Sequence, residues 1–469
     1  MPLTDLKPQY SRTELKTGSR RKGYKLMTKY YESHNHDPHH TFFYGFLCLI
    51  YDGINTLDEL KSNMRLFFIS STKHVVIEDE DVEEYLQKAR RNKLIRFQND
   101  NKITLTNEGV ELVEYSYFWN LHTSYWMRRF FSKTTVLLGT AIFLIIISLI
   151  KILTGLNLGS QGMSTEGFEN LTDLVKIGII FILGMRLNKD KIASIIIILL
   201  MLLTGGTLAW SSIEALLNPV EIIPTVQSYI ICIVSILVNV GLMFLKGMVG
   251  RISGNLSFLS DSKDSGLNVK LSVGVLIGLT FAVFGYYFVD AIVGIIISIL
   301  VFKEGLEILY ELSKKEEDFD ITAIKVYADN VYDNRLTAYL LGSIRRESIS
   351  RSDIIDNFNI GLTLGRKYYE GFADFFYNDL GSNIAEKHLD KLIEGNLIEI
   401  FDNNLVLTLK GLKIFYKAKV REFRERAYNI NLGGRFKWQN LICILFLLMF
   451  IIVIIFAPQI NSWFASLYR

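Results

Sequence analysis

The sequence predicts a polytopic α-helical membrane protein that also carries two soluble α+β domains. Half of the 469 residues are hydrophobic and 21% are charged, so the apolar residues must be concentrated in blocks. Several blocks reach about 20 residues, the length of helix that crosses roughly 30 Å of hydrocarbon. Between and around them, shorter stretches change from helix-like to strand-like periodicity, which is typical of small soluble domains.

Composition limits what the chain can do. The net charge of +3 gives no reason to expect a polyanionic partner. The three cysteines (Cys48, Cys232 and Cys443) lack paired spacing, so no disulfide framework is expected. Residues 1–25 contain no apolar run of the kind found in a cleaved signal peptide. We expect no enzymatic activity and no permanently bound cofactor.

Six spans are predicted within residues 134–316, and a seventh within residues 440–458. The six are Thr134–Leu153, Gln161–Met185, Ile192–Leu217, Gln227–Leu245, a stretch ending with Leu271–Val289, and Ala291–Ile308; the seventh is Leu441–Pro458. Lysine and arginine occur before the first span, in every second loop, and after the sixth span, and the alternate loops have none. Because basic loops stay in the cytoplasm, both ends of the six-span block are expected there. The tail, residues 459–469, is then expected outside the cell membrane.

Two soluble domains are predicted, at residues 41–130 and 320–430, after a flexible N-terminal segment at residues 1–40. In the first, the amphipathic helix Asp81–Asn92 precedes a hairpin formed by Leu94–Phe97 and Ile103–Leu105, and a further helix follows. In the second, the helix Asn383–Glu394 precedes strands at Leu397–Ile400 and Leu405–Leu407. Helix, two-stranded wing and long helix resemble a winged helix, present twice.

Winged helices often bind DNA, through a basic helix that contacts phosphates. Here each candidate helix mixes acidic and basic residues, as a solvated surface does. Nucleic acid is therefore a possible partner that we do not favour. Dimerisation or regulation is the favoured role of both domains.

Charged residues interrupt two of the predicted spans. The second span contains Glu166, Glu169, Asp173 and Lys176, and the segment leading into the fifth contains Asp261, Asp264 and Asn268. A charge at the bilayer centre costs on the order of 2.5–3.5 kcal/mol, so such residues usually line a pathway or a site. Residues four apart share one helix face, so Glu169 with Asp173 and Asp264 with Asn268 offer four oxygen ligands to a divalent cation. The alternative is that they lie in water near the span ends or form structural ion pairs.

Residues 134–316 resemble the cation diffusion facilitator family. The closest stretches are residues 253–264 and Leu271–Gly278, which are similar to the family's fifth-span segment, followed by Val289–Gly294 and preceded by Glu214–Pro219. The resemblance implies a six-helix bundle, a dimer, and export of divalent cations in exchange for protons. Residues 320–430 do not resemble the family's usual cytoplasmic domain.

By position, the resemblance places the transport site at Glu169, Asp173, Asp264 and Asn268, with Glu166 and Asp261 as secondary candidates. No histidine stands among the four, and oxygen-only ligands suit Mn²⁺, Fe²⁺ or Mg²⁺ better than Zn²⁺. Lys176 lies on the face of Glu169 and departs from the family pattern. Its ammonium either blocks the site or takes part in proton coupling.

Four of the seven histidines fall together, at His34, His36, His39 and His40. A short histidine tract can collect transition metals as a peripheral site, and it can equally be a polar linker.

Two functions follow. The first is a proton-coupled efflux transporter for divalent cations, embedded in the lipid bilayer as a homodimer, with regulatory or dimerising winged helices. The second is a transport-inactive sensor or regulator that uses its winged helices to bind DNA or protein.

Overall fold

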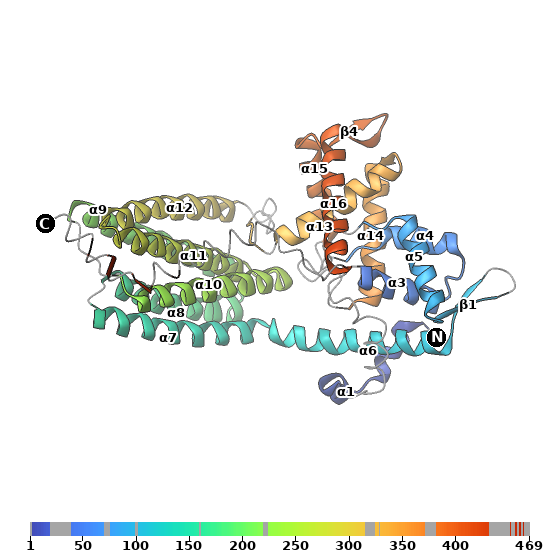
Figure 1. The fold of residues 1–469 in the computed structure, drawn as a ribbon, viewed down its shortest axis with the longest axis horizontal. Helices are drawn as coiled ribbons and strands as arrows, with labels where there is room; N and C mark the ends of the chain where they lie inside the picture. Colours follow the sequence, from blue (N-terminus) through green and yellow to red (C-terminus); the bar gives the residue numbers. More distant parts are fainter. Residues whose placement is uncertain are drawn as a thin grey trace. The chain divides into compact units, whose positions relative to one another are not determined.

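The computed structural model describes residues 2–18, 39–69, 76–98, 102–158, 161–218, 224–314, 324–327, 329–370 and 381–430, and a few positions between 451 and 463. The chain forms two compact units (Figure 1). The first combines residues 1–130 with residues 329–434, and the second combines residues 131–328 with residues 435–469. Both predicted soluble domains therefore belong to one unit, although the spans separate them in sequence.

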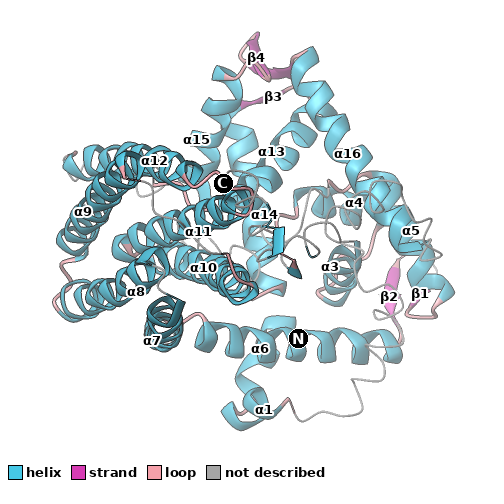
Figure 2. Ribbon diagram, turned by 60° about the vertical axis from the view of Figure 1, so that its left-hand side comes forward, coloured by secondary structure: helices cyan, strands magenta, loops and turns pink. Residues whose placement is uncertain are grey.

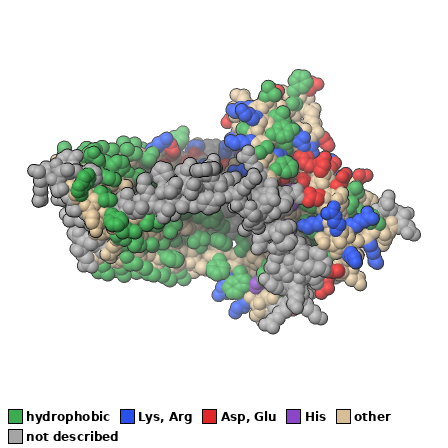
Figure 3. Space-filling view, in the orientation of Figure 1, with side chains coloured by type: hydrophobic (Ala, Val, Ile, Leu, Met, Phe, Trp, Pro, Cys, Tyr) green, Lys and Arg blue, Asp and Glu red, His purple; other side chains and the backbone are tan. Residues whose placement is uncertain are grey.

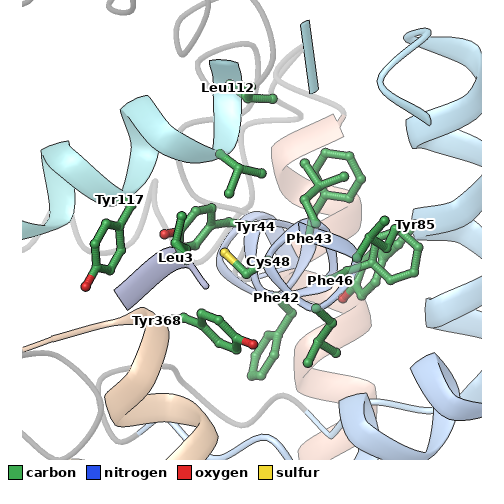
Figure 4. Close-up of a cluster of buried hydrophobic side chains, with 14 of the residues drawn as sticks. Leu3, Phe42, Phe43, Tyr44, Phe46, Cys48, Tyr85, Leu112, Tyr117 and Tyr368 are labelled. Carbon is green, nitrogen blue, oxygen red and sulfur yellow. The ribbon is translucent and has the colours of Figure 1, made fainter. Parts of the chain in front are cut away.

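The first unit contains two modules, and the first of them consists of helices around one short hairpin. Its elements are η1 (Leu3–Gln9), α1 (Arg12–Thr17), α3 (His39–Tyr51), α4 (Leu57–Leu66), α5 (Asp79–Arg91), β1 (Ile95–Phe97), β2 (Ile103–Leu105) and α6 (Asn107–Phe130). Strands β1 and β2 are antiparallel, with Ile95 opposite Leu105. Helix α3 is at the centre of the core, and aromatic side chains surround it (Figure 4).

The N-terminal segment differs from the flexible segment predicted for residues 1–40. Residues 3–17 form two helices, and Leu3 is fully buried in the core around α3. The backbone N–H of Leu3 donates to Asp52, which helps to hold the segment in place. The apolar positions in these short helices were too few for their periodicity to be recognised in the sequence.

The second module repeats the order of helix, hairpin and helix. It comprises α13 (Asp329–Arg346), β3 (Ile349–Ser350), α14 (Arg351–Tyr368), α15 (Gly381–Glu394), β4 (Ile398–Phe401), β5 (Asn404–Leu407) and α16 (Leu409–Ile430). The sheet has the order β3-β5-β4, and both of its pairings are antiparallel.

The same joint between hairpin and final helix occurs in both modules. Thr106 donates from its backbone N–H to the carbonyl of Leu94 (2.9 Å) and from its hydroxyl to that of Lys93 (2.8 Å). Thr408 donates in the same way to Leu397 and Asn396. Three residues after each threonine comes a glycine, Gly109 or Gly411, where a Cβ would lie 2.2 or 2.0 Å from the carbonyl oxygen of Leu94 or Leu397. Only glycine fits so close to the backbone, which explains why Thr-x-x-Gly follows both hairpins.

The two modules pack against each other through polar contacts as well as apolar ones. Figures 1 and 2 both place α3 and α4 beside α14. Lys419 donates to the carbonyl of Val76 (2.6 Å), and Arg345 pairs with Glu78 (2.9 Å). His39 lies at the same interface, with Nδ1 2.6 Å from the Tyr85 hydroxyl and Nε2 2.9 Å from Glu422. The two modules therefore form one folded body.

The second unit is a bundle of long helices. They are α7 (Lys133–Leu158), α8 (Gln161–Ile179) with its π-helical continuation η3 (Ile180–Arg186), α9 (Asp190–Leu217), α10 (Val226–Ser253), α11 (Leu256–Ala282) and α12 (Phe288–Ser313). Among the described residues, four helices are long and apolar enough to cross a membrane: α7 over Lys133–Leu153, α9, α10 and α11. Helices α8 and α12 are long but carry more charge. The predicted seventh span, Leu441–Pro458, lies largely outside the described residues.

The surface of this bundle is apolar, whereas its interior is partly polar. Large exposed hydrophobic side chains cover the outer faces of α7, α9 and α12 (Figure 3). Serine, asparagine, aspartate and lysine side chains are buried between the helices. This arrangement suits a hydrocarbon solvent, in which apolar side chains face lipid and polar groups must find partners inside.

The fifth helix is longer than predicted. Helix α11 begins at Leu256, so the acidic segment before Leu271 is part of it. Gly254 (φ 59°) ends α10, and the Asn255 side chain accepts from the backbone N–H of Phe258 (3.1 Å) and caps α11. Asp190 from α9 also accepts from the backbone N–H groups of Leu256 and Ser257. These caps place Asp261, Asp264 and Asn268 on the same helix.

A buried carboxylate and lysine cluster between α8 and α11

The acidic residues predicted on two spans meet in the centre of the bundle. Helix α8 approaches α7 closely at Gly167, where a Cβ would lie 2.6 Å from Ile152, and the Ser148 hydroxyl donates to the Gly167 carbonyl. From α8, Asp173 and Lys176 extend into the interior, and Asp264 extends from α11. All three side chains are buried.

Lys176 lies between the two carboxylates. Its Nζ is 2.8 Å from Asp173 Oδ1 and 2.6 Å from Asp264 Oδ2. The ammonium thus bridges carboxylates from two different helices, as a bound metal cation would. Two carboxylates and one ammonium leave one net negative charge in the cluster, and burying unbalanced charge is costly unless further partners satisfy it.

Asn268 completes the cluster and joins it to a pocket. Its amide nitrogen donates to Asp173 Oδ2 (2.9 Å), so both oxygens of Asp173 are engaged. The pocket comprises about 360 Å³ of space between atoms, part of which is open to the surroundings. Its walls come from α8, α9, α11 and α12, and its lining residues are Thr172, Asp173, Lys176, Met201, Thr204, Gly205, Leu208, Asp264, Leu267, Asn268, Leu271 and Val301. The polar side chains lie on one wall and apolar residues form much of the rest.

Asp261 belongs to a separate pair. It is 2.8 Å from the ammonium of Lys246 on α10, and that ammonium also donates to the hydroxyl of Ser265 (2.9 Å). Both charged side chains are buried. Since Asp261 does not line the pocket, its secondary candidacy as a ligand is not supported, and it instead connects α10 to α11.

The structure brings together three of the four predicted ligands: Asp173, Asp264 and Asn268. The side chains of Glu166 and Glu169 lie outside the described residues, although the backbone of both is part of α8. Among the side chains that are described, no group of three or more histidine, cysteine, aspartate and glutamate residues is arranged to hold a metal ion. This agrees with the position of Lys176, whose ammonium fills the space between the carboxylates.

The histidine tract does not form a described surface site. His34 and His36 lie outside the described residues, and His39 and His40 form the start of α3. His39 is buried with both ring nitrogens close to protein groups, so it is not available to a peripheral metal.

Sequence reasoning missed the partner of Asp261 and the contribution of α9. The sequence pattern predicts Lys246 in one of the basic loops that follow a span, but α10 continues to Ser253 and makes this lysine part of the bundle. Thr204 lies in an apolar run, and nothing in its neighbourhood signals a pocket.

Known proteins show the same kind of transmembrane domain. Residues 137–314 match the cation efflux transmembrane domain family. The chain is also similar to the manganese efflux system protein MneS of Bacillus subtilis (strain 168), at 22% identity over 203 residues, which are 40% of this chain and 69% of that protein. No solved structure matches the chain. The resemblance inferred for residues 134–316 is thus confirmed for the transmembrane domain, and a transport domain also confirms the prediction that the chain is not an enzyme.

Proposed function

We propose that this chain exports divalent cations through its helix bundle and binds them at Asp173, Asp264 and Asn268. The observation that carries the proposal is the ammonium of Lys176, held between carboxylates of α8 and α11. Two carboxylates that converge from separate helices on one positive charge form a cation site, and the lysine is its internal occupant. Glu169, four residues before Asp173 on α8, is the predicted fourth ligand.

The ligand chemistry favours hard cations. Once the ammonium moves aside, the carboxylates of Asp173 and Asp264 and the side chain of Asn268 line the pocket, together with Thr172 and Thr204. Oxygen ligands suit Mn²⁺, Fe²⁺ and Mg²⁺ better than Zn²⁺. The similarity to a protein named for manganese efflux supports Mn²⁺ as the first substrate to test.

The remaining parts of the proposal rest on the sequence and on the similarity to the cation efflux domain. They are exchange for protons, a homodimer, cytoplasmic placement of both winged-helix modules, and an outside C-terminal tail after a seventh span. Basic residues flanking alternate spans support the placement.

The same lysine supports a second candidate function. If the ammonium never leaves the carboxylates, the bundle cannot take up a cation and is a transport-inactive sensor or regulator. The structure of the cluster is compatible with both functions, and flux distinguishes them.

The test is Mn²⁺ uptake into proteoliposomes that contain a metal-sensitive dye. We expect the unaltered chain to transport Mn²⁺ and the variants Asp173→Asn and Asp264→Asn to lose this transport. Lys176→Met removes the internal competitor and leaves the carboxylates uncompensated, at a cost of about 3–5 kcal/mol that metal binding then relieves. We therefore expect roughly tenfold or more tighter Mn²⁺ binding in this variant.

Glu304→Gln is the matched control, because Glu304 pairs with Lys270 outside the pocket and its loss should leave flux unchanged. Uptake that persists in both aspartate variants would disprove the site. Absence of flux in the unaltered chain, together with binding in Lys176→Met, would favour the sensor.

A further inference from the structure

The exposed side of α16 carries a row of large apolar residues. Leu409, Tyr416, Val420 and Phe423 are 88%, 50%, 47% and 60% exposed. Their spacing places them on one face of the helix. A separate face of the helix holds the buried residues Gly411, Phe415, Lys419 and Glu422. Helix α16 packs against α13, so its core contact is already made, and the apolar row faces away from the core.

The first module shows what this face does when it is covered. Aligning the Thr-x-x-Gly joints places Phe118 at the position of Val420 and Leu121 at that of Phe423. Phe118 and Leu121 are only 0% and 5% exposed. The N-terminal helices cover them: the Tyr10 and Phe118 rings are 5.1 Å apart, and Trp126 donates to the carbonyl of Lys16 (3.2 Å). Figures 1 and 2 both show α1 beside α6. The equivalent face of α16 has no such cover among the described residues.

Charge identifies the partner. Lys413, Lys417 and Arg421 are exposed, and at about 100° per residue they lie on one flank of the apolar row. Lys410 lies on the same flank, and its ammonium donates to the carbonyl of Gly395 (2.7 Å). Glu422 is the only acidic residue in the sequence of positions 409–423, and its side chain is buried. A second copy of the helix would bring like charges together. An apolar row flanked by lysine and arginine is instead complementary to anionic phospholipid.

We propose that α16 lies on the surface of an anionic bilayer, with Tyr416, Val420 and Phe423 entering the headgroup boundary and the basic flank contacting lipid phosphates. The partner is the membrane itself and not a soluble protein. This inference is independent of the cation site.

The position of α16 in the chain supports the same partner. The helix ends at Ile430, and the predicted seventh span begins at Leu441. The connecting residues can reach at most roughly 35 Å, so α16 is tethered near the membrane. Tethering gives a high effective concentration, so a modest interface is enough.

The test uses the full chain with Cys48, Cys232 and Cys443 replaced by alanine and an environment-sensitive fluorophore attached at Val420→Cys. The chain is reconstituted in phosphatidylcholine vesicles with or without 30% phosphatidylglycerol, and lipids that carry a quencher report contact. We expect at least twofold stronger quenching at this position in anionic vesicles than with the label at Glu111→Cys, which occupies the position of Lys413 on α6. High salt should weaken the quenching.

Charge reversal in the triple variant Lys413→Glu, Lys417→Glu, Arg421→Glu should abolish the difference in quenching between the labels at Val420 and Glu111. Quenching at Val420 no stronger than at Glu111 in both lipid mixtures would overturn the proposal. So would a disulfide formed between two unlabelled Val420→Cys chains in either lipid mixture, because it would show a second copy on this face.

Discussion

The two units of the molecule differ in the polarity of their interiors and of their surfaces. In the first unit, the core around α3 consists of aromatic and aliphatic residues such as Phe43, Phe46 and Tyr85. In the helix bundle, lysines and aspartates are buried, and large apolar residues such as Phe143 are exposed. The difference follows from the solvent: water drives apolar groups inward, whereas lipid does not distinguish a leucine on the surface from one in the interior. Burial therefore has a different energetic meaning in each unit.

Replacing one phenylalanine in each unit tests this comparison with the largest expected effect. Phe46 is fully buried on α3, and Phe143 on α7 is 53% exposed. Phe46→Ala should destabilise the first unit by about 3–5 kcal/mol, because it removes apolar surface and leaves a cavity. Phe143→Ala faces the hydrocarbon and should have little effect. Thermal unfolding of the purified chain in detergent measures both, and similar losses would contradict a lipid-facing α7.

The buried charges give a smaller expected effect. Lys246→Met leaves Asp261 without its ammonium partner inside the bundle. A lone aspartate at bilayer depth costs on the order of 2.5–3.5 kcal/mol, so the variant should unfold at a lower temperature. The double variant Lys246→Met, Asp261→Asn removes both charges and should recover most of the loss. If the double variant is no more stable than the single one, the pair is not the reason that these charges are tolerated.

The parts of the fold that could be predicted are those whose signals are local. Apolar runs predict the helices of the bundle, and alternating periodicity predicts both hairpins. The Thr-x-x-Gly that follows each hairpin is equally local, because a glycine there must approach a carbonyl oxygen. The start of α11 was misplaced because Asp261 and Asp264 resemble a loop until their partners are known. Those partners, Lys246 and Lys176, come from other helices.

In the candidate site, too, the residues could be predicted from local spacing but their partners could not. The spacing of Asp173, Asp264 and Asn268 indicated a shared site, and the structure places them together. Lys176 was assigned to the same face, but its position between both carboxylates depends on how α8 and α11 pack. The packing of the two modules into one unit could likewise not be predicted, because contacts such as Lys419 to Val76 join residues from distant parts of the sequence.

The smallest expected effect comes from two carboxyl groups of α5, one of which is buried and the other ion-paired. Burial raises the pKa of Asp81, whereas hydrogen bonds from Arg65 lower the pKa of Asp79. A raised pKa contributes stability that is complete below the unfolded value of about 3.9 and lost as pH rises through the folded value. Charged Asp81 therefore opposes folding at pH 7, and Asp81→Asn should raise the unfolding temperature there but not near pH 3.

The pKa shift of Asp79 has the opposite sign and therefore the opposite effect on stability. Its lowered pKa contributes stability that is present above about pH 3.9 and is lost as pH falls through the folded value. Asp79→Asn should therefore lower the unfolding temperature at pH 7, and less so in acid. Unfolding temperatures of both variants between pH 3 and pH 7 provide the measurement. Shifts of the same sign at pH 7 would mean that burial and pairing do not act on these two carboxyls as the structure indicates.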